Sequence, residues 1–262
     1  MFNLIKRRAI KSLKKEKNLL NQKFLEYIIL TNAAFSEGHG TDGSNYLGFG
    51  ILYYSFVHLL KANVSVCLGS GGGFVPRLMR QAQIDLGIKN KSKTILVDAN
   101  LPELGYGSPD YINKNSFFRT FYPDIKILFK TTKEAIKYFE ENKIKIDYLH
   151  IDADHSYEGV SFDYKTYKLF MSKNFIITIH DTGIYPGVKK LIKELHKERD
   201  IEILNFDYLW AGLSIIKPKK APIKKILKPS KKDFLTRVDY SFGLIGKFLN
   251  TFFPKIYKSL RE

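Results

Sequence analysis

From Asn63 onward, short apolar runs alternate with longer segments of helical periodicity, and this alternation constrains the fold more than any other feature. The runs that predict strands are Asn63–Leu68, Thr94–Asp98, Ile125–Lys130, Ile146–Asp152, Asn174–His180, Ile201–Phe206 and Leu209–Ile216. The segments that predict helices are Phe74–Leu86, Lys133–Asn142, Tyr157–Met171 and Gly187–Arg199. Strands joined through helices make right-handed crossovers, so we expect an α/β domain with a mostly parallel sheet and helices on both faces. The last two strands are joined by a short turn, which predicts one antiparallel strand.

The net charge of +17 is carried by the two ends of the chain. Residues 1–30 hold eight Lys and Arg against two acids, and residues 217–262 hold thirteen against three. Residues 31–216 are nearly balanced, with 22 basic residues against 21 acidic ones. The basic character therefore belongs to the flanks and not to the predicted α/β domain.

We divide the chain into four parts. Residues 1–60 are expected to hold a basic helix, a polar loop and an uncharged helix that together form a cap or lid. The uncharged stretch, Gly43–Leu60, contains polar residues that favour a buried helix over a membrane span. Residues 61–216 form the α/β domain. Residues 217–233, with eight lysines and three prolines, are typical of a linker. In residues 234–262, apolar residues recur at helical spacing beside lysines, which predicts an amphipathic helix interrupted near Pro254.

The polar loop Glu37–Ser44 precedes the uncharged helix, and two interpretations of it stay open. It is either a lid over a ligand or a plain capping loop with Ser44 as the N-cap of the helix.

The basic C-terminal part, 217–262, favours association with an anionic membrane surface. The alternative is a helix that docks on the protein itself or on a partner subunit. Nucleic acid is disfavoured because no recognition motif accompanies the charge. The lone Cys67 fits a reducing compartment and the N-terminus has no uninterrupted apolar signal region, so we expect a cytoplasmic protein, peripheral at the inner face of the membrane.

A glycine-rich turn, Gly69-Ser70-Gly71-Gly72-Gly73, follows the first predicted strand and leads into a helix. Glycines there let the backbone approach a ligand closely. Phe74 stands where a dinucleotide fingerprint needs a third glycine, which disfavours a nicotinamide cofactor. Asp98 ends the second strand, where a carboxylate is placed to accept both hydroxyls of a ribose, although an acid that caps the following loop is the alternative.

Two polar clusters, IDADHSYEG at 151–159 and His180-Asp181-Thr182, follow the fourth and fifth predicted strands. Both are expected at the same edge of the sheet as the glycine turn. Three carboxylates and two histidines brought together there would be costly to desolvate without a function.

These motifs resemble a small bacterial branch of the class I S-adenosylmethionine-dependent methyltransferases, which carries I-D-G-D-H-S-Y-E-G, a helix, and then H-D-T. The resemblance covers about residues 60–216, and it departs from the pattern at Ala153, where the family has glycine. It implies a Rossmann-like methyltransferase fold with a seven-stranded sheet in the order 3-2-1-4-5-7-6, strand 7 antiparallel.

The resemblance also implies roles for individual residues. Gly69, Ser70 and Gly71 would face the cofactor and Asp98 would bind its ribose, with Asp152 close by. His155 would be the general base, acting with Asp152. Asp152, Asp181 and His180 match the positions that hold a divalent cation, Mg²⁺ or Mn²⁺, in metal-dependent sugar and catechol O-methyltransferases. Those relatives have a carboxylate where His180 stands, and an imidazole favours a softer metal or none.

The sequence thus favours an O-methyltransferase that acts on a saccharide hydroxyl of a cell-surface or lipid-linked glycan. One alternative is a methyltransferase for nucleic acid or another small molecule. Another is a non-catalytic, membrane-tethered scaffold with a degenerate cofactor pocket. The oligomeric state and the acceptor are left open.

Overall fold

The computed structural model describes residues 29–30, 33, 35–41, 46–101, 108, 111, 113, 115–207, 209 and 211–219. These residues belong to one unit, Met1–Ala221. Three predicted features lie outside the described residues: the C-terminal helix at 234–262, the part of the linker that follows Lys219, and the N-cap candidate Ser44. Within the described ranges, no helix is both long and apolar enough to cross a membrane.

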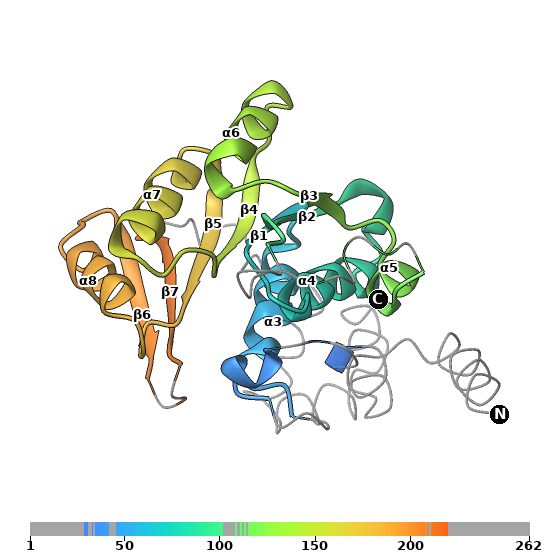
Figure 1. Cartoon of the computed structure of the whole chain (residues 1–262). Helices are drawn as coiled ribbons and strands as arrows, with labels where there is room; N and C mark the ends of the chain where they lie inside the picture. The colour runs from blue at the N-terminus through green and yellow to red at the C-terminus, as the bar shows by residue number, and fades with distance from the viewer. Residues whose placement is uncertain are drawn as a thin grey trace, which may run out of the picture. The chain divides into compact units, whose positions relative to one another are not determined.

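The described residues form a seven-stranded sheet in the order β3-β2-β1-β4-β5-β7-β6, as expected (Figure 1). Its strands are β1 (Val64–Leu68), β2 (Lys93–Val97), β3 (Lys126–Leu128), β4 (Ile146–Ile151), β5 (Met171–His180), β6 (Ile201–Phe206) and β7 (Leu213–Pro218). The first five strands run parallel. Strand β7 lies antiparallel between β5 and β6, which confirms the predicted antiparallel strand.

Side chains that alternate along each strand divide the core into two layers. Cys67, which has no disulfide partner, packs with helices α3 (Gly50–Leu60) and α4 (Phe74–Asp85). Its neighbours Val66 and Leu68 point to the other face, which α6 (Thr132–Glu141), α7 (Tyr157–Lys168) and α8 (Pro186–Leu195) cover. Successive residues of a strand point to opposite faces, so an apolar run such as VSVCL supplies both layers.

Three shorter elements complete the described part of the chain. The 3₁₀ turn η2 (Ser36–His39) precedes α3, and η3 (Lys89–Lys91) precedes β2. Helix α5 (Phe117–Phe121), which we did not predict, lies between β2 and β3 and buries Phe118 in the layer of α3 and α4. Its five residues are too few for a recognisable apolar period.

Several predicted boundaries are wrong, each for a local reason. Helix α3 begins at Gly50 and not at Gly43, and it buries only the face of Gly50, Tyr53 and Val57. The N-cap of α3 is Phe49, whereas the sequence offered Ser44 for this position. Strand β5 begins at Met171, predicted as helical, because Met171 pairs with Ile146 ahead of a register shift. Strand β7 begins at Leu213 because Gly212, with φ 73°, closes a turn.

Candidate active site

The carboxyl ends of four neighbouring strands bring the predicted site residues into one row. Leu68 of β1 pairs with Val97 of β2 on one side and with Ile151 of β4 on the other. Ile151 pairs in turn with Ile179 of β5. The residues that follow these positions are Asp98, Gly69, Asp152 and His180, in that order along the edge. The expectation that they share one edge of the sheet is confirmed.

The glycine turn packs directly against the backbone that follows β4. Gly69 has φ 71°, and a Cβ there would overlap the carbonyl oxygen of Asp152. Gly73, with φ 81°, is the N-cap residue of α4. Tyr111 donates a hydrogen bond from its hydroxyl to the Gly71 carbonyl oxygen at 2.6 Å. The sequence needs glycine at 69 because both the backbone angle and the close approach exclude a side chain.

Asp98 stands directly after β2 with its carboxyl group largely buried. Its Oδ1 accepts a hydrogen bond from the Asn100 amide at 2.7 Å. Burial raises the pKa of Asp98, while the backbone amides of Asn100 and Ser70 offset part of that rise. Asp98 therefore contacts the following loop, as the capping alternative requires, and it also lies beside the glycine turn.

Four imidazoles surround the carboxylate of Asp152. His155 Nε2 and His180 Nδ1 lie 3.4 and 3.3 Å from its Oδ1, and His39 Nε2 and His150 Nε2 each lie 3.7 Å from its Oδ2. Burial alone would raise the pKa of Asp152, but His180, His150 and His155 together hold it well below its usual range. Asp152 is thus an anion at the centre of the site.

His155 joins the residues after β4 to those after β5. Its Nε2 lies 2.9 Å from Asp181 Oδ2, and its ring stacks on Tyr185 with centroids 4.3 Å apart. Burial lowers the pKa of His155, but Asp152 and Asp181 outweigh it and raise the pKa to about 9. Ser156 is the N-cap of α7 and accepts a hydrogen bond from the Gly159 amide, which fixes the backbone next to His155.

His180 and Asp181 end β5 in a constrained arrangement. His180 is buried, its Nε2 lies 3.2 Å from the Gly38 carbonyl oxygen, and its Nδ1 lies 3.3 Å from Asp181 Oδ1. Burial lowers the pKa of His180, while the carboxylates of Asp152 and Asp181 raise it above its ordinary value. Asp181 has φ 60°, a left-handed conformation that costs a non-glycine residue energy and is common at functional sites.

Two groups of side chains among the described residues have the composition and spacing to hold a cation. One is His39, Asp152 and His180; the other is Asp152, His155 and Asp181. The predicted metal ligands Asp152, Asp181 and His180 are divided between these groups, with Asp152 common to both.

Comparisons with known proteins identify the fold of the domain that carries these residues. Residues 66–182 match a family model described as a methyltransferase domain. No curated protein matches the chain. The O-methyltransferase from Bacillus cereus in complex with SAH has a TM-score of 0.56 at 12% identity, covering 80% of this chain and 97% of that one. The domain has the Rossmann-like methyltransferase fold.

Two further solved structures share this methyltransferase fold. The O-methyltransferase TomG from Streptomyces achromogenes, involved in tomaymycin synthesis and solved with SAM, has a TM-score of 0.54 at 10% identity and covers 78% of this chain and 97% of that one. The SAH-bound methyltransferase PaMTH1 from Podospora anserina has a TM-score of 0.53 at 14% identity and covers 73% of this chain and 88% of that one.

Two imidazoles at the edge of this methyltransferase fold were missed by the sequence analysis. His150 lies within β4, and the two-residue period of a strand places Tyr148, His150 and Asp152 on one face, so this signal was present. His39 comes from the predicted lid loop, of which residues 37–41 are described. No local pattern in the sequence connects it to Asp152.

Proposed function

We propose that this protein is an S-adenosylmethionine-dependent methyltransferase that methylates a hydroxyl oxygen. The single observation that carries the proposal is the row Asp98, Gly69, Asp152 and His180 along one edge of the sheet. Ligands of open α/β sheets bind at this edge, and here it presents a glycine turn, a ribose-type carboxylate and titratable groups together. The match of residues 66–182 to a methyltransferase domain supports the same activity.

The residues at the edge fit the cofactor. Gly69, Ser70 and Gly71 would lie against its methionine and ribose parts, and Asp98 would accept hydrogen bonds from the ribose hydroxyls. The bound cofactor supplies an electrophilic methyl group on a sulfonium. Transfer is an in-line displacement, so the main work of the protein is to hold the donor and the acceptor oxygen in line.

His155 is the proposed general base, with Asp152 as its partner. Its side chain is 26% exposed, against 3% for His180, so an acceptor can reach it. A neutral imidazole can take the proton of a hydroxyl, a contribution of about 10²–10⁴-fold to the rate. The role requires the neutral ring, which Asp152 and Asp181 oppose in the free protein, so acceptor binding has to weaken these contacts.

A divalent cation at Asp152, Asp181 and His180 remains part of the proposal. A cation bound beside the acceptor would lower the pKa of its hydroxyl. The donor set around Asp152 fits Mg²⁺ poorly, because Mg²⁺ prefers oxygen ligands in octahedral geometry and four imidazoles approach this carboxylate.

The acceptor is proposed to be a saccharide of a cell-surface or lipid-linked glycan. Support comes from the resemblance of the motifs IDADHSYEG and HDT, and from the basic ends of the chain, which would keep the enzyme at an anionic membrane surface. The solved structures with this fold that were compared above are described as methyltransferases, two of them as O-methyltransferases.

Transfer of a tritiated methyl group tests this function. The full chain is incubated with labelled S-adenosylmethionine in parallel reactions, each of which contains one class of acceptor: oligosaccharides, lipid-linked glycans, RNA or DNA. We expect label in a saccharide fraction, resistant to mild alkali as a methyl ether is. Label confined to nucleic acid would overturn the saccharide assignment, and failure to bind the cofactor would favour the scaffold alternative.

The role of the proposed base is tested by comparing a substitution of His155 with the same substitution at an exposed histidine. With the acceptor so identified, His155→Ala should lower kcat by about 10²–10⁴-fold and leave cofactor affinity unchanged. His196→Ala, at an exposed histidine after the end of α8, is the control and should change neither quantity. Equal activity of His155→Ala and the control would exclude His155 as the base.

A further inference from the structure

We infer that His39, Asp152 and His180 form a binding site for a transition-metal ion, with Zn²⁺, Fe²⁺ and Co²⁺ as the ions it would take. The inference stands on side-chain geometry and does not depend on methyl transfer. It differs from the predicted ligand set by the inclusion of His39, which comes from the segment before the α/β domain.

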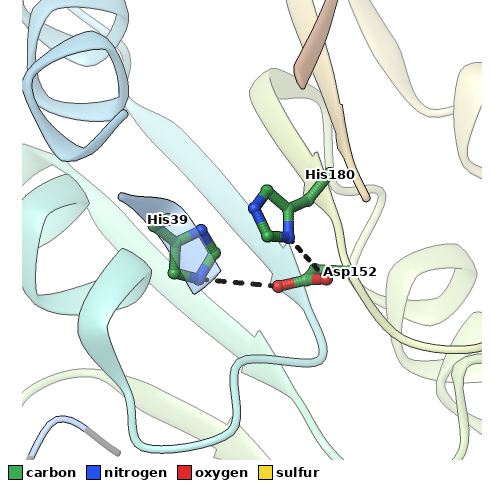
Figure 2. A group of neighbouring side chains, drawn as sticks. All are labelled: His39, Asp152 and His180. Carbon is green, nitrogen blue, oxygen red and sulfur yellow. Dashed lines mark ion pairs between the residues drawn. The ribbon is translucent and has the colours of Figure 1, made fainter. Parts of the chain in front are cut away.

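The three side chains converge from distant parts of the chain. His39 ends η2, Asp152 follows β4, and His180 ends β5 (Figure 2). One ligand atom from each lies within 4.8 Å of the others, and the rings of His39 and His180 have centroids 4.1 Å apart. Both histidines are buried, with 4% and 3% of their surface exposed. Two buried imidazoles and one carboxylate that is 13% exposed thus face a common point.

The outer hydrogen bonds of both rings leave the inner nitrogens available. Tyr53 holds His39 through its Nδ1 at 3.0 Å, so Nε2 faces Asp152. His180 Nε2 lies 3.2 Å from the Gly38 carbonyl oxygen, which can only accept, so Nε2 carries the proton and donates it. In the neutral ring, Nδ1 then holds the lone pair. Orientation of each ring through its second nitrogen is the usual arrangement around a bound metal.

His180 Nδ1 is the independent sign of a ligand. In the neutral ring, the lone pair of this buried nitrogen faces carboxylate oxygens of Asp152 and Asp181, each 3.3 Å away, and no described residue donates a hydrogen bond to it. A buried polar atom without a hydrogen bond is costly. A cation between His180 Nδ1, His39 Nε2 and Asp152 would satisfy the nitrogen and neutralise the carboxylate at once.

The donor set selects the kind of metal. Imidazole nitrogen suits Zn²⁺, Fe²⁺ and Co²⁺, whereas Mg²⁺ and Ca²⁺ prefer oxygen. Three protein ligands leave a coordination position open for water or another ligand. Because His39 belongs to the chain segment Phe35–Thr41, a bound ion would also link this segment to the residues at the carboxyl ends of β4 and β5.

Titration of the metal-free, tag-free full chain with Co²⁺ tests the inference. We expect one equivalent to bind and to give visible absorption bands of low-coordinate Co²⁺, which Zn²⁺ abolishes and millimolar Mg²⁺ leaves unchanged. His39→Ala and His180→Ala should weaken Co²⁺ binding by at least the roughly 10–100-fold that loss of an orienting partner costs. Tyr53→Phe, which removes only the hydrogen bond to His39, should weaken it less.

His155→Ala is the matched control, because His155 contacts the same carboxylate but belongs to the other cation-capable group. It should not weaken Co²⁺ binding, because the ring that it removes is a positive charge beside Asp152 and not a ligand. If His155→Ala abolishes Co²⁺ binding and His39→Ala does not, the ion lies at Asp152, His155 and Asp181 and the inference is wrong; absence of Co²⁺ binding also overturns it. Cofactor titration of the same samples separates the two proposals, since either ligand can bind if the other fails.

Discussion

The backbone amide of Asp152 donates a hydrogen bond to the carbonyl oxygen of Leu68 at 2.8 Å, which locks the start of the Asp/His cluster to the start of the glycine turn. The Gly69 amide makes the equivalent bond to the Val97 carbonyl oxygen at 2.8 Å. The row of site residues is therefore positioned by main-chain hydrogen bonds of the sheet. The polar side chains of the row can therefore be replaced without removing the main-chain hydrogen bonds that position it, whereas a side chain at Gly69 would disturb it.

Gly69→Ala should disrupt the cofactor site, and Gly87→Ala provides its control. The two glycines have nearly the same φ, 71° and 69°. A Cβ at Gly87 meets nothing within 4 Å, whereas one at Gly69 overlaps the Asp152 carbonyl oxygen. Gly87→Ala should cost only the left-handed strain, about 1–2 kcal/mol. Gly69→Ala should lower the free energy of unfolding in urea by more than this amount. It should also weaken binding of S-adenosylmethionine, measured by calorimetry, at least tenfold. Equal effects of the two substitutions would contradict the close-packing argument.

Asp98→Asn should weaken S-adenosylmethionine binding by about 10–100-fold, because hydrogen bonds to a charged group contribute roughly 1.5–3 kcal/mol. Asp147→Asn is the control. Asp147 accepts hydrogen bonds from the Asn63 and Val64 amides at the start of β1, the opposite edge of the sheet. It should lower stability and leave cofactor affinity unchanged in calorimetry. An Asp98→Asn variant with normal affinity would remove the ribose role of Asp98.

Local patterns in the sequence predicted the strands and the shared edge, whereas the order of the strands came from the family resemblance. Each apolar run identifies a strand, and each polar residue that directly follows a run must lie at the carboxyl end. Asp98, Asp152 and His180 were placed in this way. Strand ends that depend on pairing were harder: Met171 looks helical in the sequence and becomes part of β5 because Ile146 is there to pair with it.

His39 could not be placed from the sequence. Its position depends on the packing of the chain before α3, where the His39 carbonyl oxygen accepts a hydrogen bond from the Phe49 amide and its ring contacts Tyr53. Neither contact has a sequence period. His150 was missed for a different reason. A histidine inside an apolar strand was taken as part of the apolar run, although its position two residues before Asp152 places both side chains on the same face.

Asp163 of α7 should make stability depend on pH. The residue is 1% exposed, and burial raises its pKa to about 7, with a smaller rise from Asp154 and a partial offset from Thr132. In the unfolded chain the pKa of an aspartate is about 3.9. Between that pH and about 7, Asp163 is therefore ionised in the unfolded chain but protonated in the folded one. Stability is therefore lost as pH rises from about 4 to 7.

Asp163→Asn removes this ionisation with little change in shape. The free energy of unfolding of the variant, relative to that of the parent chain, should rise by up to about 4 kcal/mol between pH 4 and pH 8. Urea unfolding at several pH values measures the difference. Parallel pH profiles for the two chains would show that Asp163 ionises normally in the folded state.

The central claim is that one edge of the sheet binds the methyl donor, and a crystal structure of the chain with S-adenosylhomocysteine tests it most directly. We predict electron density against Gly69–Gly71, with both ribose hydroxyls on the Asp98 carboxylate and the sulfur on the side of Asp152. Density for the ligand at any other place, or none from crystals soaked at saturating concentration, would contradict the account.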